Sequence, residues 1–291
     1  MELLQLKYFQ TVARHEHMTR AAEELCIVQP ALSKMISILE KELGVQLFDR
    51  VGKHIKLNQY GRAFLKNVEK ALAALEDGKR ELADLSLEKY KYIHLAILVG
   101  SHILSDILVE FRKQYSNIGF HLVQHVSRSA IQPNFDLCIS SSPLELQNID
   151  STPLVNEEIF LAVPSNHRLA GRSSVHLQEV ADEDFISLRS GKSMRGLTDD
   201  FCRLAGFTPR IVFETDDPST VSGLVKAGLG VAFIPGVSWG GTTGSSIILL
   251  HIKEPICRRT LWLSWVRDRY VTESSQIFRQ FMIEYFSRFK K

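Results

Sequence analysis

The stretch "TRAAEELCIVQPALSKMISILEKELGVQLFDR" (residues 19–50) contains two helical patterns with very little chain between them. We expect Thr19 to cap the first helix, in which the small residues Ala21 and Ala22 would let a neighbouring helix approach closely. Pro30 fits the first turn of the second helix, because its missing N–H has no partner at that position. The pattern therefore predicts two short helices joined by a tight turn, which is the geometry of a helix-turn-helix.

The second helix has one apolar face and one polar face. The apolar face carries Leu32, Met35, Ile36, Leu39 and Leu43, and Gly44 is expected to end the helix. On the opposite face Gln29, Ser33 and Ser37 follow one another at helical spacing, with Pro30 and Lys34 beside them. Such side chains reach base edges and phosphates when a helix enters the major groove of DNA. The alternatives are a solvated face, or one that contacts another protein.

The segments on either side fit the same interpretation. Residues 3–16 have apolar side chains at helical spacing and predict a helix before the pair. After Gly44, "VQLFDRVGKHIKLNQYG" (residues 45–61) predicts a small hairpin, or wing. Residues 50–66 contain no aspartate or glutamate, and their basic residues are Arg50, Lys53, Lys56, Arg62 and Lys66. We expect the basic side chains of the wing to meet the sugar-phosphate backbone of DNA.

The order of residues in this region resembles the N-terminal domain of LysR-type transcriptional regulators. The matching segments are "LKYFQTVA" (6–13), "TRAAEEL" (19–25) and "QPALSKMISILEKELGVQLFDR" (29–50). The resemblance implies an α/β protein with an N-terminal winged helix-turn-helix, a long dimerising linker helix and a C-terminal effector domain. That domain is expected to have two lobes and to resemble periplasmic binding proteins. The chain departs from the family pattern at Val28, Lys34 and Asn58, which affects the expected sequence preference.

The resemblance also implies roles for individual residues. It places Gln29, Pro30, Ser33 and Lys34 at the groove-facing end of the recognition helix, and Arg50 and Lys53 on phosphates. Thr19, Ser37 and Lys56 complete the set that we expect to contact DNA.

Residues 60–88 contain neither proline nor a turn cluster and predict one long helix. Its apolar stripe consists of Leu65, Val68, Leu72, Leu75 and Leu82, with Lys79 at the one position where an apolar residue is missing. This narrow stripe has coiled-coil spacing and predicts dimerisation, or alternatively packing against the chain's own C-terminal domain. Two symmetric reading heads would require an approximate inverted repeat in the DNA.

Beyond residue 91 the pattern changes to short apolar strands that alternate with helices. The strands are "YIHLAILV", "FHLVQHV", "FDLCIS", "IFLAVP", "DFISL", "RIVFET", "GVAFIP" and "TLWLSWV". They predict mainly parallel sheets covered by helices. The expected domains are residues 1–59, 60–88 and 89–291, with lobe I made of 89–163 and 267–291 and lobe II of 164–266.

Ligands of α/β sheets bind beyond the carboxyl ends of the strands, so we expect the effector there. The candidate residues are Gly100, Ser101, His102, Ser127, Ser140, Arg189, Ser190 and Ile234. Serines and backbone N–H groups suit a small carboxylate or amino-acid-like metabolite, with Arg189 or Arg195 as its charge partner. The loop after the first strand and the segment 125–135 are shorter than is usual in the family, which predicts a reshaped pocket.

Motifs of catalysis are incomplete. "GKSMRG" (191–196) lacks the first glycine of a phosphate-binding loop, and "GLGVAF" (228–233) lacks the third glycine of a dinucleotide fingerprint. The cysteines Cys26, Cys138, Cys202 and Cys257 are far apart, and "HEH" (15–17) is too compact for a metal-binding helix. We therefore predict that the protein is not an enzyme and needs no metal or cofactor.

The formal net charge of +2 decides little about partners. The N-terminus does not have the pattern of a signal peptide, and no run of residues is apolar enough to span a membrane. The prediction is a cytoplasmic regulator that binds promoter DNA, a small effector, a second copy of itself as a dimer or tetramer, and RNA polymerase. The alternative is a small-molecule-binding protein whose helical head contacts other proteins.

Overall fold

A computed structural model describes residues 1–51, 54–85, 91–124, 135–146, 148–239, 246–267 and 269–289. By its internal contacts the chain divides into two compact units, Met1–Leu87 and Glu88–Lys291. We refer to them as the head and the C-terminal unit.

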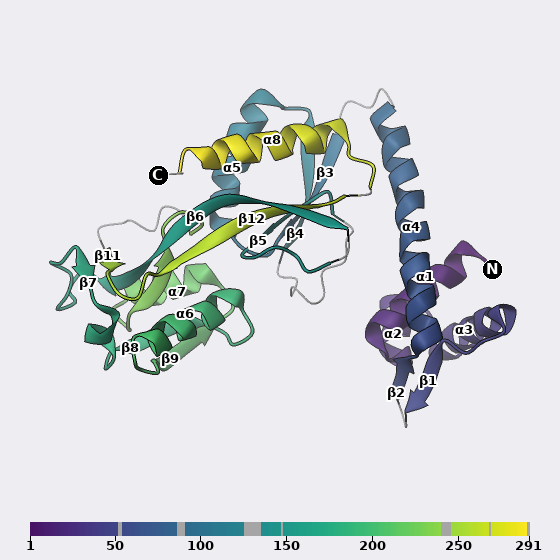
Figure 1. The fold of residues 1–291 in the computed structure, drawn as a ribbon, viewed down its shortest axis with the longest axis horizontal. Coiled ribbons are helices and arrows are strands. Elements are labelled where there is room, and N and C mark those ends of the chain that lie inside the picture. Colours follow the sequence, from purple (N-terminus) through teal and green to yellow (C-terminus); the bar gives the residue numbers. More distant parts are fainter. Residues whose placement is uncertain are drawn as a thin grey trace. The chain divides into compact units, whose positions relative to one another are not determined.

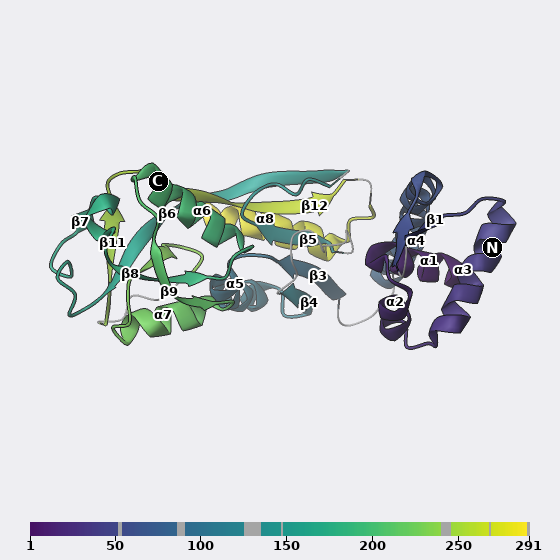
Figure 2. The same cartoon turned by 90° about the horizontal axis from the view of Figure 1, so that it is seen from below.

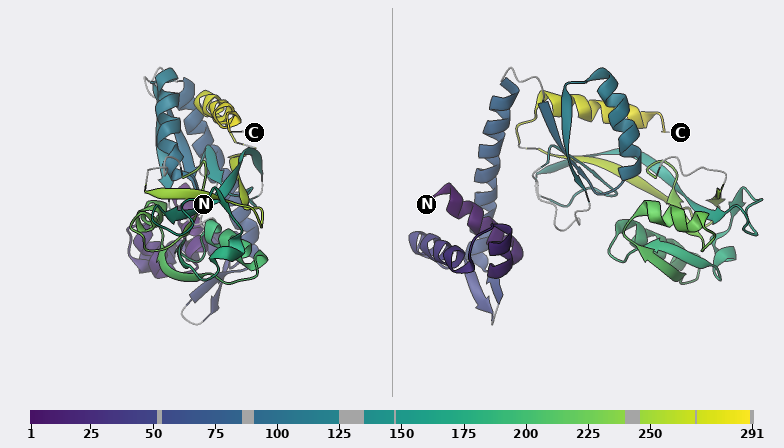
Figure 3. Two further views of the ribbon diagram at one scale, coloured as in Figure 1. Left: turned by 90° about the vertical axis from the view of Figure 1, so that its left-hand side faces the viewer. Right: turned by 180° about the vertical axis from the view of Figure 1, so that it is seen from behind.

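The head contains the predicted helices and wing (Figure 1). Its elements are α1 (Leu3–His15), α2 (Met18–Glu24), α3 (Gln29–Leu43), β1 (Phe48–Val51), β2 (His54–Leu57) and α4 (Gln59–Leu85). The strands β1 and β2 pair antiparallel and project beyond the helices of the head (Figure 3). The buried core of the head combines the small residues of α2 with larger apolar side chains of α1, α3 and the wing.

The predicted cap of α2 is wrong. The N-cap is His17, whose ring nitrogen accepts a hydrogen bond from the backbone N–H of Arg20 at 3.4 Å. Thr19 lies inside the first turn of α2 and is exposed. The sequence pattern favoured threonine because its hydroxyl is a good cap, but the turn after α1 places an earlier residue at that position.

The C-terminal unit contains strands and helices, as predicted, but they alternate only in part of it. Its elements are β3 (Lys91–Ile97), α5 (Ser101–Gln114), β4 (Ile118–Gln124), β5 (Leu137–Ser140), β6 (Ile149–Pro164), β7 (Ser174–Val175), the 3-10 helix η2 (Leu177–Val180), β8 (Asp184–Leu188), α6 (Ser193–Leu204), β9 (Arg210–Thr215), α7 (Pro218–Lys226), β10 (Ala232–Pro235), β11 (Ile247–Ile252), β12 (Arg258–Val266) and α8 (Glu273–Ser287). No helix within the described residues is both long and apolar enough to cross a membrane.

The sheets are mixed, and this corrects the expectation of mainly parallel strands. The main sheet has the order β4-β3-β5-β12-β6-β11-β7, with β10 also paired to β6. β3 is parallel to β4 and β5, but the long strands β6 and β12 pair antiparallel to each other and run side by side (Figure 1 and Figure 2). The parallel strands β8 and β9 form a separate pair beside α6 and α7. Apolar strand composition alone does not distinguish these directions.

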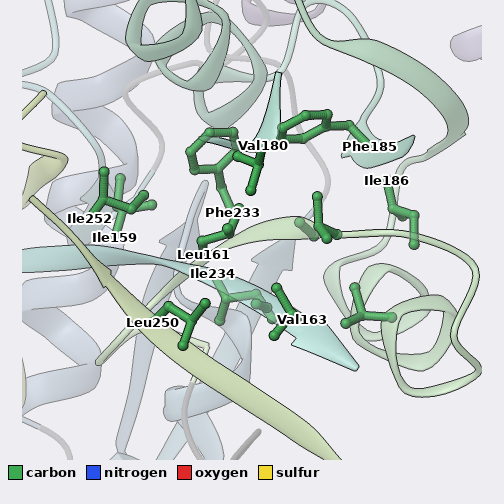
Figure 4. Close-up of a cluster of buried hydrophobic side chains, with 14 of the residues drawn as sticks. Ile159, Leu161, Val163, Val180, Phe185, Ile186, Phe233, Ile234, Leu250 and Ile252 are labelled. Atoms are coloured by element: carbon green, nitrogen blue, oxygen red, sulfur yellow. The ribbon is translucent and has the colours of Figure 1, made fainter. Parts of the chain in front are cut away.

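Two separate apolar cores give the C-terminal unit its two lobes. The core of lobe I is built by β3, β5, α5 and α8, and that of lobe II by β8, β10, β11, α6 and α7. Figure 4 shows part of the second core, where Leu161 and Val163 of β6 lie among side chains such as Phe233 and Leu250.

The two cores share the long strand β6, whereas the buried apolar side chains of β12 belong to lobe I. On β6, Val155 packs in lobe I and Ile159 in lobe II, whereas on β12 Leu261 and Leu263 pack in lobe I. The apolar packing therefore changes from lobe I to lobe II within β6, before the expected boundary at 163/164, and returns to lobe I between Cys257 and Leu261, before the one at 266/267. The apolar periodicity of a strand continues where the strand passes from one core to the other, so the sequence pattern does not indicate where one lobe ends.

Candidate functional site

The recognition helix α3 is held to the head by one face only. Leu32, Ile36 and Leu39 are buried, whereas Gln29, Pro30, Lys34 and Ser37 are exposed and Ser33 is half-buried. Val28 is the N-cap and offers no side-chain hydrogen bond, and its backbone oxygen accepts the N–H groups of Ala31 and Leu32. Gly44 ends the helix in the left-handed conformation, with φ of 72°. The polar groups predicted for DNA contact thus lie together on the outer face of α3.

Two carboxylates fix the wing against the helices. Glu40 of α3 accepts the backbone N–H groups of Leu47 and Phe48 at 2.7 and 3.3 Å. Glu16, just after α1, accepts the N–H of Leu57 at 2.9 Å. Because both strands are bonded to helix-borne side chains, the wing and α3 hold a fixed spacing within the head.

The start of α4 is also tied to the wing. Asn58 accepts the N–H of Gly61 at 2.9 Å and donates to the backbone oxygen of Gln46 at 2.9 Å, so it caps the helix. A Cβ at Gly61 would lie 2.2 Å from the backbone oxygen of Leu47, so only glycine permits this close approach. These contacts position the strand that carries Lys56, whose side chain is exposed. Lys53 and the side chain of Arg50 lie outside the described residues.

The apolar stripe of α4 is divided between two environments, which corrects the assignment of all its residues to a dimer. Val68 is 2% exposed and Leu72 9% exposed, because both pack against α1 in the head's own core, and Leu65 packs beside them. Leu75 and Leu82 are 51% and 70% exposed. Val68 and Leu72 are therefore already covered within one chain, and the exposed part of the stripe is its C-terminal half.

A cavity of about 620 Å³ opens in the C-terminal unit at the carboxyl ends of β3, β5 and β8. It is lined by four of the predicted effector residues, Gly100, Ser101, Ser140 and Ser190, and also by Lys192, Trp239 and Arg259. We call this cavity the cleft. Its walls come from both lobes, since α5 belongs to the core of lobe I and α6 to that of lobe II.

Of the helices that begin at the cleft, α5 and α6 have no side-chain cap, whereas Asp217 caps α7. Gly100 precedes α5 with φ of 81°, and Lys192 precedes α6; neither helix has a side-chain hydrogen bond at its N-cap. Uncapped N–H groups together with the helix dipole favour negative charge at these positions. The cleft can therefore hold an anion against backbone N–H groups and serine hydroxyls.

Three other predicted effector residues, His102, Arg189 and Ile234, do not line the cleft. Ile234 is fully buried in the core of lobe II, which rules out ligand contact in this arrangement. The ring of His102 contacts the hydroxyl of Ser219 at 2.8 Å. Arg189 is 63% exposed and pairs with Asp216 at 3.4 Å. Ser127 lies outside the described residues. His102 and Arg189 lie next to residues that line the cleft, but the direction of each side chain depends on its packing.

Arg195, the alternative charge partner, is occupied elsewhere. It donates to Asp199 at 2.9 Å and also to Glu214. Burial opposes its charge, but these two carboxylates raise the pKa of Arg195 above its ordinary value. Its positive charge is thus satisfied within lobe II.

Beside the cleft lies a buried ion pair that the sequence analysis did not predict, and of its two residues only Arg259 lines the cleft. Arg259 of β12 lies directly opposite Glu157 of β6, and its Nε donates to Glu157 Oε1 at 2.7 Å. A signal was present in the sequence, because Arg259 is in phase with the buried Leu261 and Glu157 with the buried Ile159. Opposite charges at two inward-facing strand positions indicate that the two side chains form a buried ion pair.

Comparison with known proteins agrees with these features. The model of the bacterial regulatory helix-turn-helix protein of the lysR family matches residues 3–62, and that of the LysR substrate binding domain matches residues 93–287. The chain belongs to the LysR family. It is a DNA-binding transcriptional regulator with an effector-binding domain, and regulators of this family bind DNA and small effectors and form oligomers.

Several relatives of this LysR regulator align over their whole length. The uncharacterized HTH-type transcriptional regulator YybE of Bacillus subtilis (strain 168) is 37% identical over 99% of this chain and 100% of its own. The transcriptional dual regulator GltC of the same organism is 32% identical over 100% and 99%. Among solved structures, the effector binding domain of QuiR in complex with shikimate is 25% identical with a TM-score of 0.59, covering 69% of this chain and 100% of that one.

Proposed function

We propose that this LysR regulator binds promoter DNA as a homo-oligomer and changes its activity when a small carboxylate binds in the cleft. The observation that carries the proposal is the cleft itself, where two uncapped helix N-termini meet serine hydroxyls and the basic groups of Lys192 and Arg259. The similarity to QuiR supports the proposal, because the effector binding domain of QuiR was solved in complex with shikimate, and shikimate is a carboxylate.

In this proposal the outer face of α3 enters the major groove. Gln29, Ser33 and Ser37 contact base edges, and Pro30 and Lys34 lie against the groove beside them. Lys56 and the other basic residues of the wing contact phosphates and supply most of the salt-dependent affinity. Two heads in one oligomer would read an approximate inverted repeat.

The effector acts by shifting a population. It binds better to one relative placement of the two lobes, and thereby stabilises one arrangement of the oligomer on DNA. We further propose that the protein works in the cytoplasm, contacts RNA polymerase at the promoter and performs no catalysis.

Fluorescence anisotropy with the DNA beside its own gene, and with random DNA, tests the proposal at two salt concentrations. Gln29→Ala should reduce the preference for the specific site by about 1–3 kcal/mol. Lys56→Gln should weaken binding to both DNAs alike. If the wild type has no preference for the specific DNA, or Gln29→Ala leaves that preference intact, the assignment of α3 is wrong.

A further inference from the structure

Arg259 is a buried cation that nevertheless reaches the cleft. Its residue is 7% exposed, and it lines the cleft of about 620 Å³. It also lines a second cavity of about 440 Å³, on the side of Asn156, Leu197 and Trp262. Arg259 therefore borders both cavities, and its Nη1 contacts Met194, which lines both of them as well.

The partner of this cation is turned away from both cavities. The side chain of Glu157 is fully buried and belongs to the lining of neither cavity. Its carboxylate accepts the backbone N–H groups of Val237 and Ser238 at 3.0 and 2.7 Å, and the Ser238 hydroxyl at 2.7 Å. With Arg259 as a further donor, the carboxylate is satisfied on all sides. A ligand in the cleft would meet the guanidinium and not the carboxylate.

Some N–H groups of the guanidinium have only a weak acceptor within the described part of the protein. Nε donates to Glu157, Nη2 to the hydroxyl of Ser238 at 2.6 Å, and Nη1 to the sulfur of Met194 at 3.4 Å. A guanidinium has more N–H groups than these three contacts use, and a thioether sulfur is a weak acceptor. Within the described residues, Nη1 thus has no oxygen acceptor. Such a buried donor is stabilised by an incoming oxygen.

Other basic groups near the cleft are less suited to recognise a carboxylate. Lys192 lines the cleft, but its side chain is 40% exposed and its ammonium lies 3.9 Å from Asp216. An exposed ammonium is a mobile point charge, whereas a guanidinium fixed on one side presents two parallel N–H groups to a carboxylate. Arg259 is also shielded from water, which strengthens its interaction with an anion.

We propose that Arg259 is the residue that recognises the acidic group of the effector, with its outer N–H groups on the two oxygens of one carboxylate. Glu157 and Ser238 are positioning residues, since they orient the guanidinium without touching the ligand. The effector's body then occupies the cleft, beside Ser101 and Ser140. This inference rests on the proposed function, and it specifies a planar carboxylate in preference to a neutral amide of the same shape.

The test measures discrimination between acids and their amides on the full-length protein. The probes are acetate, succinate, benzoate and shikimate, each paired with the corresponding amide, and binding is followed by thermal shift and calorimetry. For the wild type we expect at least one acid to bind and its amide to bind much more weakly.

Four variants separate charge recognition from structural damage. Arg259→Lys keeps the charge but loses the two parallel N–H groups of the guanidinium, and should bind the acid roughly 10- to 100-fold more weakly. Glu157→Gln/Arg259→Gln removes both buried charges together, so it avoids leaving one uncompensated, and should bind acid and amide equally. Glu157→Gln alone should weaken acid binding while retaining the preference for it. Arg258→Gln is the matched control on the same strand, because Arg258 does not line the cleft, and it should bind like the wild type.

Each outcome decides between the two proposals. If the double variant is folded and still prefers the acid, Arg259 is not the recognition residue, while the effector site stands. If no acid of the panel binds the wild type, both this inference and the proposed carboxylate effector are overturned. If acid and amide bind the wild type equally, the cleft binds ligands, but charge recognition by Arg259 is refuted.

Discussion

Replacing Leu82 by alanine should break self-association without unfolding the head. Leu82 is 70% exposed on α4, in the half of the stripe that the head leaves uncovered. Full burial of a leucine side chain is worth about 1.5–3 kcal/mol, so covering the exposed part returns roughly 1–2 kcal/mol. A twofold dimer contains two copies of Leu82, so the variant should lose about 2–4 kcal/mol of association free energy. This corresponds to roughly a 30- to 1000-fold higher dissociation constant.

Leu72→Ala on the same helix is the matched control. Leu72 is 9% exposed and packs in the head's own core, so the same truncation should cost about 2–5 kcal/mol of stability. It should leave the dissociation constant nearly unchanged. Analytical ultracentrifugation measures self-association, and hydrogen exchange of α1 and α3 measures the stability of the head. Unchanged self-association in Leu82→Ala, or weakened self-association in Leu72→Ala, would refute the division of the stripe.

Three further predictions concern the head, its charge and the thiols. Gly61→Ala should destabilise the head by about 1–3 kcal/mol in urea unfolding, because the added Cβ would lie 2.2 Å from a backbone oxygen. Gly78→Ala on the same helix should stabilise the head by about 0.5–1 kcal/mol, because its added Cβ would have no other atom within 4 Å. Lys56→Gln should lower the slope of the logarithm of DNA affinity against the logarithm of salt concentration by about one, and an unchanged slope would remove this residue from the phosphate contacts. Burial raises the pKa of the Cys202 thiol to about 12, so very little of it is the reactive thiolate at pH 8. Iodoacetamide should therefore modify the exposed Cys26 in the folded protein and Cys202 only after unfolding, which mass spectrometry of the peptides can measure.

The sequence predicted the elements of the head well because their signals are local. The apolar face of α3, Pro30 in its first turn and Gly44 at its end all act within one or two helical turns. The misassigned cap of α2 was a choice between residues next to one another in the chain. Such a choice depends on the turn geometry, which the pattern does not contain.

The candidate cleft was predicted less completely. Its predicted serines and Gly100 lie at a strand end or within a few residues of one, so a rule about strand ends was enough to find them. Lys192 and Trp239 line the same cavity without such a motif, and Ile234 proved to be core. Whether a residue near a strand end faces ligand or core depends on which element packs over it.

By itself the sequence determined the head's helices and wing, most strands of the C-terminal unit and the membership of the LysR family, because repeating apolar patterns and turn residues act over short distances; β7, β11 and the first part of β6 were not predicted. Only the tertiary structure decided which half of the α4 stripe is covered, where the two lobes meet and that Glu157 pairs with Arg259. These features join residues far apart in the chain, and burial and ion pairing arise only when the fold brings such residues into contact.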